Sequence, residues 1–293
     1  MSACSGGSSS SDGSISISLT DRPIDGISAL NITVTEFWVK PQGSGPAFQL
    51  DMVATPVTVN LLELSVDDPA IFVDGANIPA GTYNWMEMVI DDSDPSLANA
   101  VTNDGAMREV DVDVPSNRIR LINQFDVAPN DSVRMLFDWD VRQGMTEAVG
   151  RDLFILKPVI RVLDVLEFGS IVGEISSATV MTPENGCNAD SMLAEDYSIG
   201  NVVYVFEGDV EPGEIGVVDP YATVDAKDED NDGDYEYRIP LMPGTYTFAA
   251  TCQGGIDSDE DDGLDSATFF LTPTAGDSVV TFEVGGEVVG PTF

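Results

Sequence analysis

Residues 15–41, ISISLTDRPIDGISALNITVTEFWVKP, contain two runs in which apolar and polar side chains alternate. The first run spans residues 14–21, the second spans residues 29–41, and turn-forming residues separate them. Alternation with a period of two places every second side chain on the same face of a β-strand. The stretch therefore predicts two strands, each with one face toward a core.

Similar alternating segments recur along the chain, and almost none has the period of an amphipathic helix. Residues 59–65, VNLLELS, are the best candidate for a helical turn, and residues 91–100 are expected to form a loop. Short strands between turn residues predict an all-β protein made of sandwiches. The further predicted strands are residues 48–52, 81–92, 108–115, 119–128, 133–141 and 153–164 in the first half, and 169–176, 201–208, 221–226, 235–241, 244–252, 267–272 and 278–286 in the second.

The length of 293 residues and the hydrophobic content of 43% predict two domains with packed cores. We expect a flexible tether over residues 1–13, followed by two β-sandwiches in tandem at 14–167 and 168–293. Each half also places Pro and Gly just before a Tyr-led strand, in NIPAGTYNW at 77–85 and in LMPGTYTF at 241–248. Glycine suits such a turn because it tolerates positive φ. The similarity between the halves therefore indicates that the same kind of turn occurs twice, with domain duplication as a secondary explanation.

The net charge is −39, from 51 acidic and 12 basic residues. Such a chain repels nucleic acid and anionic membrane surfaces and attracts cations. The excess is uneven, since the residues from Phe168 onward include 26 acidic and two basic residues, Lys227 and Arg238. Divalent cations are therefore expected partners, although an acidic surface that serves only solubility in salt remains an equal alternative.

The chain contains no histidine. This removes the commonest general base, the usual partner of a serine or cysteine nucleophile, and the usual ligand of transition metals. Catalysis by a pair of carboxylates stays compatible with the composition. We therefore expect a protein that is not an enzyme and has no catalytic residues.

Cys4 lies in MSACSGGSSSSDG, in which SAC followed by small residues resembles the lipobox of bacterial lipoprotein signals. The resemblance implies a lipid on Cys4, a hydrophobic signal ahead of it in the precursor, and a Gly/Ser tether behind it. Ser5 after the cysteine implies delivery to the outer membrane. The expected location is the outer membrane, the cell surface or the extracellular space, with membrane contact only through the lipid; a chance cysteine in a tail is the alternative.

The two other cysteines, Cys187 and Cys252, both lie in the second half. In an exported protein they would meet oxidising conditions, under which a disulfide persists. We predict a bridge between them, with two buried free thiols as the alternative.

The segment DAKDEDNDGDYEYRIP, residues 225–240, contains the first half of a D-x-D-x-D-G calcium loop. The twelfth position of that loop is Ile239 instead of a bidentate glutamate. A calcium site would therefore need further carboxylates, and a solvated turn between two strands is the alternative. The candidate ligands are Asp228, Asp230, Asp232, Asp234 and Glu236, with a second run at Asp257, Asp259 and Asp261.

Residues 15–41, together with VNLLEL, IPAGTYNWMEMVIDD and FILKPVIRVLD, resemble the family catalogued as domain of unknown function 4382. The resemblance runs from Ser14 to Leu166 and is specific in LTDRP and LKPVIRV, although Arg22 stands where a small residue is common. It implies an immunoglobulin- or transthyretin-like sandwich in a bacterial surface lipoprotein, and no catalytic residues. From Gly169, GSIVGEIS, YEYRIPLMPGTYTFAATC and SVVTFEVGG are similar to prealbumin-like, carboxypeptidase-regulatory sandwiches, a carbohydrate-binding-like fold.

These features favour a non-catalytic outer-membrane or cell-surface lipoprotein with a binding or adhesive role, stabilised by calcium and binding a glycan or another surface protein. The first alternative is a structural subunit of an extracellular filament or surface assembly, which would self-associate through an edge strand or the N-terminal tail. The second alternative is a polysaccharide-cleaving enzyme that uses two carboxylates. An aromatic platform would favour glycan binding. Contacts between copies would favour the subunit of an assembly, and a cleft with facing acids would favour the enzyme.

Overall fold

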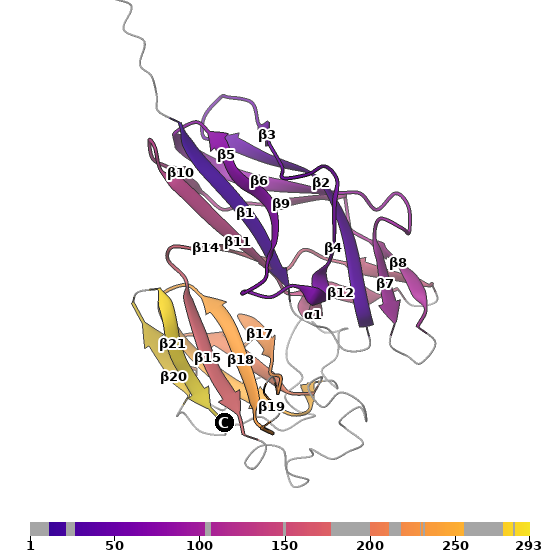
Figure 1. The fold of residues 1–293 in the computed structure, drawn as a ribbon, viewed down its shortest axis with the longest axis vertical. Helices are drawn as coiled ribbons and strands as arrows, with labels where there is room; N and C mark the ends of the chain where they lie inside the picture. The colour runs from indigo at the N-terminus through magenta and orange to yellow at the C-terminus, as the bar shows by residue number, and fades with distance from the viewer. Residues whose placement is uncertain are drawn as a thin grey trace, which may run out of the picture.

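The computed structural model describes residues 12–21, 27–102, 107–148, 151–176, 200–210, 218–228, 230, 232–254, 278–283 and 285–293. These residues form an all-β protein, as predicted, with one short α-helix and one 3₁₀ turn in the described part (Figure 1). Sheets A and B contain strands up to Asp164, and sheets C and D contain strands from Gly169 onward.

The first sandwich consists of sheets A and B. Sheet A has the strand order β14-β11-β1-β5, and sheet B has the order β10-β6-β2-β7-β8-β13-β12, with β3 and β4 also paired to β2 and β9 paired to β6. Sheet A comprises β1 (Gly13–Asp21), β5 (Ala70–Ile78), β11 (Ser132–Trp139) and β14 (Ile160–Asp164). Sheet B comprises β2 (Ile27–Pro41), β3 (Phe48–Leu50), β4 (Val57–Asn60), β6 (Gly81–Ile90), β7 (Asn99–Thr102), β8 (Glu109–Asp113), β9 (Arg118–Leu121), β10 (Phe125–Val127), β12 (Met145–Glu147) and β13 (Leu153–Leu156). The two helical turns are η1 (Leu61–Glu63) and α1 (Val141–Gly144).

The alternation in β1 and β2 decides which side chains form the core. In β1, Ile15, Ile17 and Leu19 are fully buried, and the strand pairs parallel with β11 and antiparallel with β5. In β2 the register to β6 shifts between Val34 and Glu36, which is a β-bulge. The bulge changes the phase of the alternation, so the buried residues are Leu30, Ile32 and Val34 before it, and Phe37 and Val39 after it.

The second sandwich faces sheet C, with the order β18-β15-β21, against sheet D, with the order β17-β16-β19-β20 (Figure 1). Its core includes Tyr237 and Phe248, whose ring centroids lie 6.3 Å apart. Gly173 is required beside this core, because a Cβ there would lie 2.4 Å from the Tyr237 hydroxyl. The strands are β15 (Gly169–Ile175), β16 (Val202–Glu207), β17 (Ala222–Asp225), β18 (Tyr235–Leu241), β19 (Gly244–Thr251), β20 (Val279–Phe282) and β21 (Gly286–Thr292).

The similar segments at residues 77–85 and 241–248 form the same kind of turn before a strand. The Tyr83 hydroxyl donates to the Pro79 carbonyl at 2.6 Å, and the Tyr246 hydroxyl donates to the Met242 carbonyl at 2.9 Å. In both cases the acceptor lies four residues before the tyrosine, so the phenol ties the turn to the strand that follows it. Burial raises the pKa of Tyr246 to about 12, which keeps this donor protonated.

Two of the predicted strands are wrong, because each of these segments forms two separate strands in the structure. Residues 153–164 divide into β13 and β14 on either side of Pro158, whose nitrogen carries no hydrogen, and the chain crosses from sheet B to sheet A there. Residues 119–128 divide into β9 and β10, with Ile122 between them 85% exposed.

The helical turn predicted at residues 59–65 is confirmed as η1, and the loop predicted at 91–100 ends where β7 begins at Asn99. Strand β5 was not predicted, since Gly75 interrupts its alternation and its register to β1 shifts twice. The predictions also lack β4, β7, β12, α1 and most of β21. The strand predicted at 267–272 lies outside the described residues.

We expect Tyr83→Phe and Tyr246→Phe each to lower the free energy of unfolding by about 1 kcal/mol, because each removes one partly buried hydrogen bond without leaving a cavity. Urea denaturation measures the change. Ile122→Ala is the control, and its effect should stay within about 0.5 kcal/mol because the side chain is exposed. Two Tyr→Phe variants as stable as the parent would show that the corners contribute nothing.

Candidate functional site

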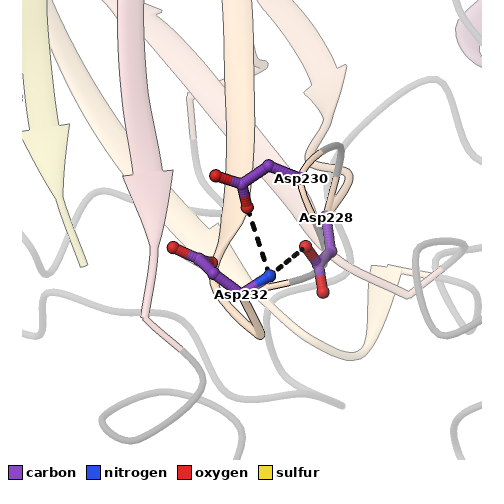
Figure 2. Close-up of side chains that lie close together, drawn as sticks. All are labelled: Asp228, Asp230 and Asp232. Atoms are coloured by element: carbon purple, nitrogen blue, oxygen red, sulfur yellow. Dashed lines mark hydrogen bonds between the residues drawn. The ribbon is translucent and has the colours of Figure 1, made fainter.

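The acidic turn between β17 and β18 brings three of the predicted calcium ligands together (Figure 2). Carboxylate oxygens of Asp228, Asp230 and Asp232 all lie within 4.8 Å of one another. The backbone N–H of Asp232 donates to Asp228 Oδ1 and to Asp230 Oδ1, both at 3.1 Å, and Gly233 N–H donates to Asp228 Oδ2 at 3.1 Å. Gly233 has φ +96°, which permits the tight bend.

The other predicted ligands are not part of this group. Asp234 donates its backbone N–H to Asp232 Oδ1 at 2.9 Å, and Glu236 closes the hairpin through backbone hydrogen bonds with Lys227. The second candidate run, Asp257, Asp259 and Asp261, lies outside the described residues. Calcium takes six to eight oxygen ligands, so three carboxylates would need water or further oxygens to complete its shell.

We predict that calcium stabilises the protein through this turn, because a bound cation replaces the mutual repulsion of the three carboxylates with coordination. A ligand that binds only the folded state stabilises it by about 2.7 kcal/mol at a hundredfold excess over Kd. Differential scanning calorimetry in millimolar calcium should therefore show a raised melting temperature, and magnesium should raise it less.

Asp230→Asn combined with Asp232→Asn should abolish the calcium effect. Asp111→Asn combined with Asp113→Asn is a matched control, because these aspartates also alternate and are exposed, on β8. An equal rise in sodium at matched ionic strength would identify simple screening and a solvated turn.

The lipid and the disulfide remain predictions. Cys252 is fully buried next to the end of β19, and both Cys187 and Cys4 lie outside the described residues.

A cavity of about 310 Å³ lies between the two sandwiches. Thr20, Asp138 and the loop at residues 64–67 line it from the first sandwich, and β15, β17 and β18 line it from the second. Its wall includes the carboxylates of Asp67, Asp138, Asp225 and Glu236.

Two of these carboxylates pair with arginines whose side chains are 7% and 13% exposed. Asp138 pairs with Arg161, which faces it across the β11–β14 ladder and lies over the ring of Tyr221 at 5.0 Å from the centroid. Burial alone would lower the pKa of Arg161, but the charge of Asp138 leads the effects that raise it, and the pKa is raised overall. Arg161 therefore joins sheet A to the second sandwich as a permanent cation.

Arg142 makes a second connection across the junction. Its Nη2 lies 3.2 Å from Asp225 Oδ1, with both side chains 7% exposed, and its Nη1 donates to the Gly254 carbonyl at 3.2 Å. Beside it, the Thr223 hydroxyl donates to Asp140 Oδ2 at 3.1 Å. Buried polar contacts thus join the two sandwiches.

This pairing bears on the carboxylate-enzyme alternative. A general acid of a glycosidase must be protonated, whereas a buried arginine partner stabilises the charged carboxylate. Arg161 and Arg142 therefore favour the charged forms of Asp138 and Asp225, which is the opposite of what a general acid requires.

We expect Arg142→Ala to lower the free energy of unfolding by about 3–5 kcal/mol, because Asp225 would remain buried without its cation. Guanidinium denaturation measures the loss. Arg108→Ala is the control: its partner Asp152 lies 2.7 Å away, but the side chains are 46% and 79% exposed, so the loss should stay below about 1 kcal/mol. Equal losses in the two variants would contradict a stabilising junction.

The outer face of sheet B carries a group of aromatic and charged side chains that we call the tryptophan–arginine face. It is organised around Glu87, which is 4% exposed although it points away from the core. The Nε of Arg118 lies 3.0 Å from Glu87 Oε1, and the Nε and Nη2 of Arg120 lie 2.8 and 2.6 Å from Oε2. The face consists of Glu36, Trp38 and Lys40 on β2, Trp85 and Glu87 on β6, and Arg118 and Arg120 on β9.

The two tryptophans of this face have different surroundings. The guanidinium of Arg120 lies over the ring of Trp85, 4.3 Å from its centroid. Trp38 faces Glu87 across the β2–β6 ladder, and its Nε1 donates to Glu36 Oε2 at 2.6 Å. Lys40 donates to the carbonyls of Pro41, Gly43 and Gly45, so it fixes a loop.

This face is not evident from the sequence. Two of the three tryptophans lie on it, but the alternation of β2 alone does not show that a bulge at Glu36 turns Trp38 outward. The sequence feature that points to this face is the alternation of Arg118 and Arg120 in a chain with only 12 basic residues.

The fold defines an all-β protein of two tandem sandwiches whose most distinctive described surface is the tryptophan–arginine face. A family model described as a domain of unknown function, DUF4382, matches residues 12–158, and the chain belongs to that family. The predicted resemblance is thereby confirmed, with the match ending before Leu166. No curated protein matches the chain.

Several solved structures are similar to the chain at low scores. A leucine-rich repeat protein from Bacteroides thetaiotaomicron is 12% identical with a TM-score of 0.24, over 97% of this chain and 26% of that one. The TIE protein of Bacillus anthracis is 12% identical with a TM-score of 0.21, over 96% of this chain and 33% of that one. GBS52, the minor pilin of Streptococcus agalactiae, is 10% identical with a TM-score of 0.17, over 95% and 94%.

The chain spans about a quarter to a third of the length of the first two of these proteins. At such TM-scores the likenesses support no conclusion about function. Among the described residues, no helix has the length and apolar character needed to cross a membrane.

Proposed function

We propose that the protein is a non-catalytic binding or adhesive protein of the cell surface that recognises a glycan. The observation that carries this proposal is the tryptophan–arginine face. Aromatic rings bind the apolar faces of sugars, and neighbouring charged groups bind their hydroxyls. Trp38 and Trp85 are intermediate in exposure and lie among such groups on one sheet face.

Further features are consistent with this role. The junction between the sandwiches is held by the buried Arg142–Asp225 ion pair and by the contact of Arg161 with the ring of Tyr221. We propose export as a lipoprotein on Cys4, a Cys187–Cys252 bridge, and calcium binding at the acidic turn as stabilising features of the same surface protein. The outer membrane or the cell surface is the proposed location.

The test is retention of the purified protein on insoluble polysaccharides, both acidic and uncharged. We expect retention on at least one of them, with Trp38→Ala weakening it by roughly threefold to tenfold through loss of the aromatic contact. Ile71→Ala is the control, because it removes an apolar side chain that is 53% exposed on the other sheet of the same sandwich. Failure of the wild-type protein to bind any polysaccharide would remove the glycan role.

A structural subunit of a surface assembly is the second candidate. Strand β21 lies at the edge of sheet C, and Val289 on it is 86% exposed. An edge strand presents unpaired backbone groups that can pair with another chain.

Light scattering with and without calcium distinguishes a monomeric binder from this subunit. An assembling subunit should form larger particles with rising concentration, and Val289→Lys should prevent their growth, because a charge on an edge strand opposes pairing. A single monomeric size under all conditions would contradict the second candidate.

A further inference from the structure

We propose that Arg118 and Arg120 form a carboxylate-binding site, and that the ligand of the tryptophan–arginine face is an acidic polysaccharide bearing uronic acids. This inference rests on the proposed glycan-binding function and names the chemical class of the glycan. It depends on how Glu87, Trp85 and Trp38 surround the two guanidinium groups.

Glu87 orients both arginines. Its carboxylate is almost completely buried, yet it accepts hydrogen bonds from Arg118 through Oε1 and from Arg120 through Oε2. The arginine side chains themselves remain 45% and 51% exposed. One buried anion therefore fixes two half-exposed cations, and the group presents one excess positive charge to solvent.

The free edges of the guanidinium groups suit a carboxylate. Arg118 uses its Nε toward Glu87, and within the described residues its Nη1 and Nη2 donate no hydrogen bond. Arg120 uses its Nε and Nη2, which leaves its Nη1 without an acceptor in that part of the chain. Two adjacent N–H groups of a guanidinium match the two oxygens of a carboxylate.

Trp85 and Trp38 have different roles in the proposed site. The ring of Trp85 lies under the guanidinium of Arg120 at 4.3 Å, so this indole orients a cation and has one face covered. Trp38 lies in the same cross-strand row as Glu87 and Arg120. It supplies the aromatic surface for a sugar ring next to the two guanidinium groups.

Charge complementarity favours an acidic ligand over a neutral one. The chain has only 12 basic residues against 51 acidic residues, yet two of the basic ones lie together here around a single carboxylate. A neutral glycan requires no such pair. Repulsion from more distant acidic groups is screened beyond about 8 Å at physiological salt, so the contacts at the site decide the binding.

The test uses polygalacturonate and its fully methyl-esterified form, which keeps the sugar ring but removes the negative charge. Affinity electrophoresis of the wild-type protein should show binding to the acid that is roughly 10-fold to 100-fold tighter than binding to the ester. Arg118→Gln should reduce binding to the acid by a similar factor, and Arg118→Lys should restore only part of it. Arg134→Gln, on an exposed arginine of sheet A, is the matched control and should bind as the wild type does.

Equal binding of the acid and the ester would overturn the acidic class and leave the glycan-binding function standing. Binding of the acid that is unchanged in Arg118→Gln, or weakened as much in Arg134→Gln, would place the site elsewhere and overturn the inference. Absence of binding to both polymers and to uncharged polysaccharides would overturn the proposed function with it. The ester comparison requires no variant, so a folding defect in Arg118→Gln would not obscure the result.

Discussion

The first sandwich depends on the backbone hydrogen bonds of β2, which pairs with β3, β4, β6 and β7. A strand with so many partners has a strongly fixed register, because a slip by one residue would turn its buried side chains to solvent. The bulge at Glu36 is the register shift that changes the phase of burial in the middle of this strand. It keeps Phe37 and Val39 in the core and turns Trp38 outward, so the packing of the core and the composition of the outer face have the same origin.

The two sandwiches meet through charge rather than through a shared apolar core. Arg142 pairs across the junction with the buried carboxylate of Asp225. Arg161 pairs with Asp138 of its own sheet and crosses the junction to the ring of Tyr221. Such pairs add little net stability compared with apolar packing, but they are costly to break and they fix geometry. In a chain so rich in acids, two scarce arginines are used to hold the sandwiches in one orientation.

A similar arrangement recurs where ligands are proposed to bind. At the tryptophan–arginine face, one buried glutamate orients two cations. At the acidic turn, backbone N–H groups and a glycine bend bring three carboxylates together. The first site is complementary to an anion and the second to a cation, and they lie in different sandwiches. Under the proposed function, the first sandwich binds an acidic glycan while calcium stabilises the second.

The sequence by itself determined the all-β class, most strands, the helical turn at η1 and the acidic turn, because each depends on residues close together in the chain. The period of two, the Pro-Gly-Tyr corners and the D-x-D-x-D-G spacing are local patterns of this kind. Only the tertiary structure decided that Pro158 moves the chain between sheets, that Arg142 reaches Asp225, and that Glu87 meets Arg118 and Arg120. Those contacts join residues more than thirty positions apart, and they depend on strand register and bulges that alternation alone does not specify.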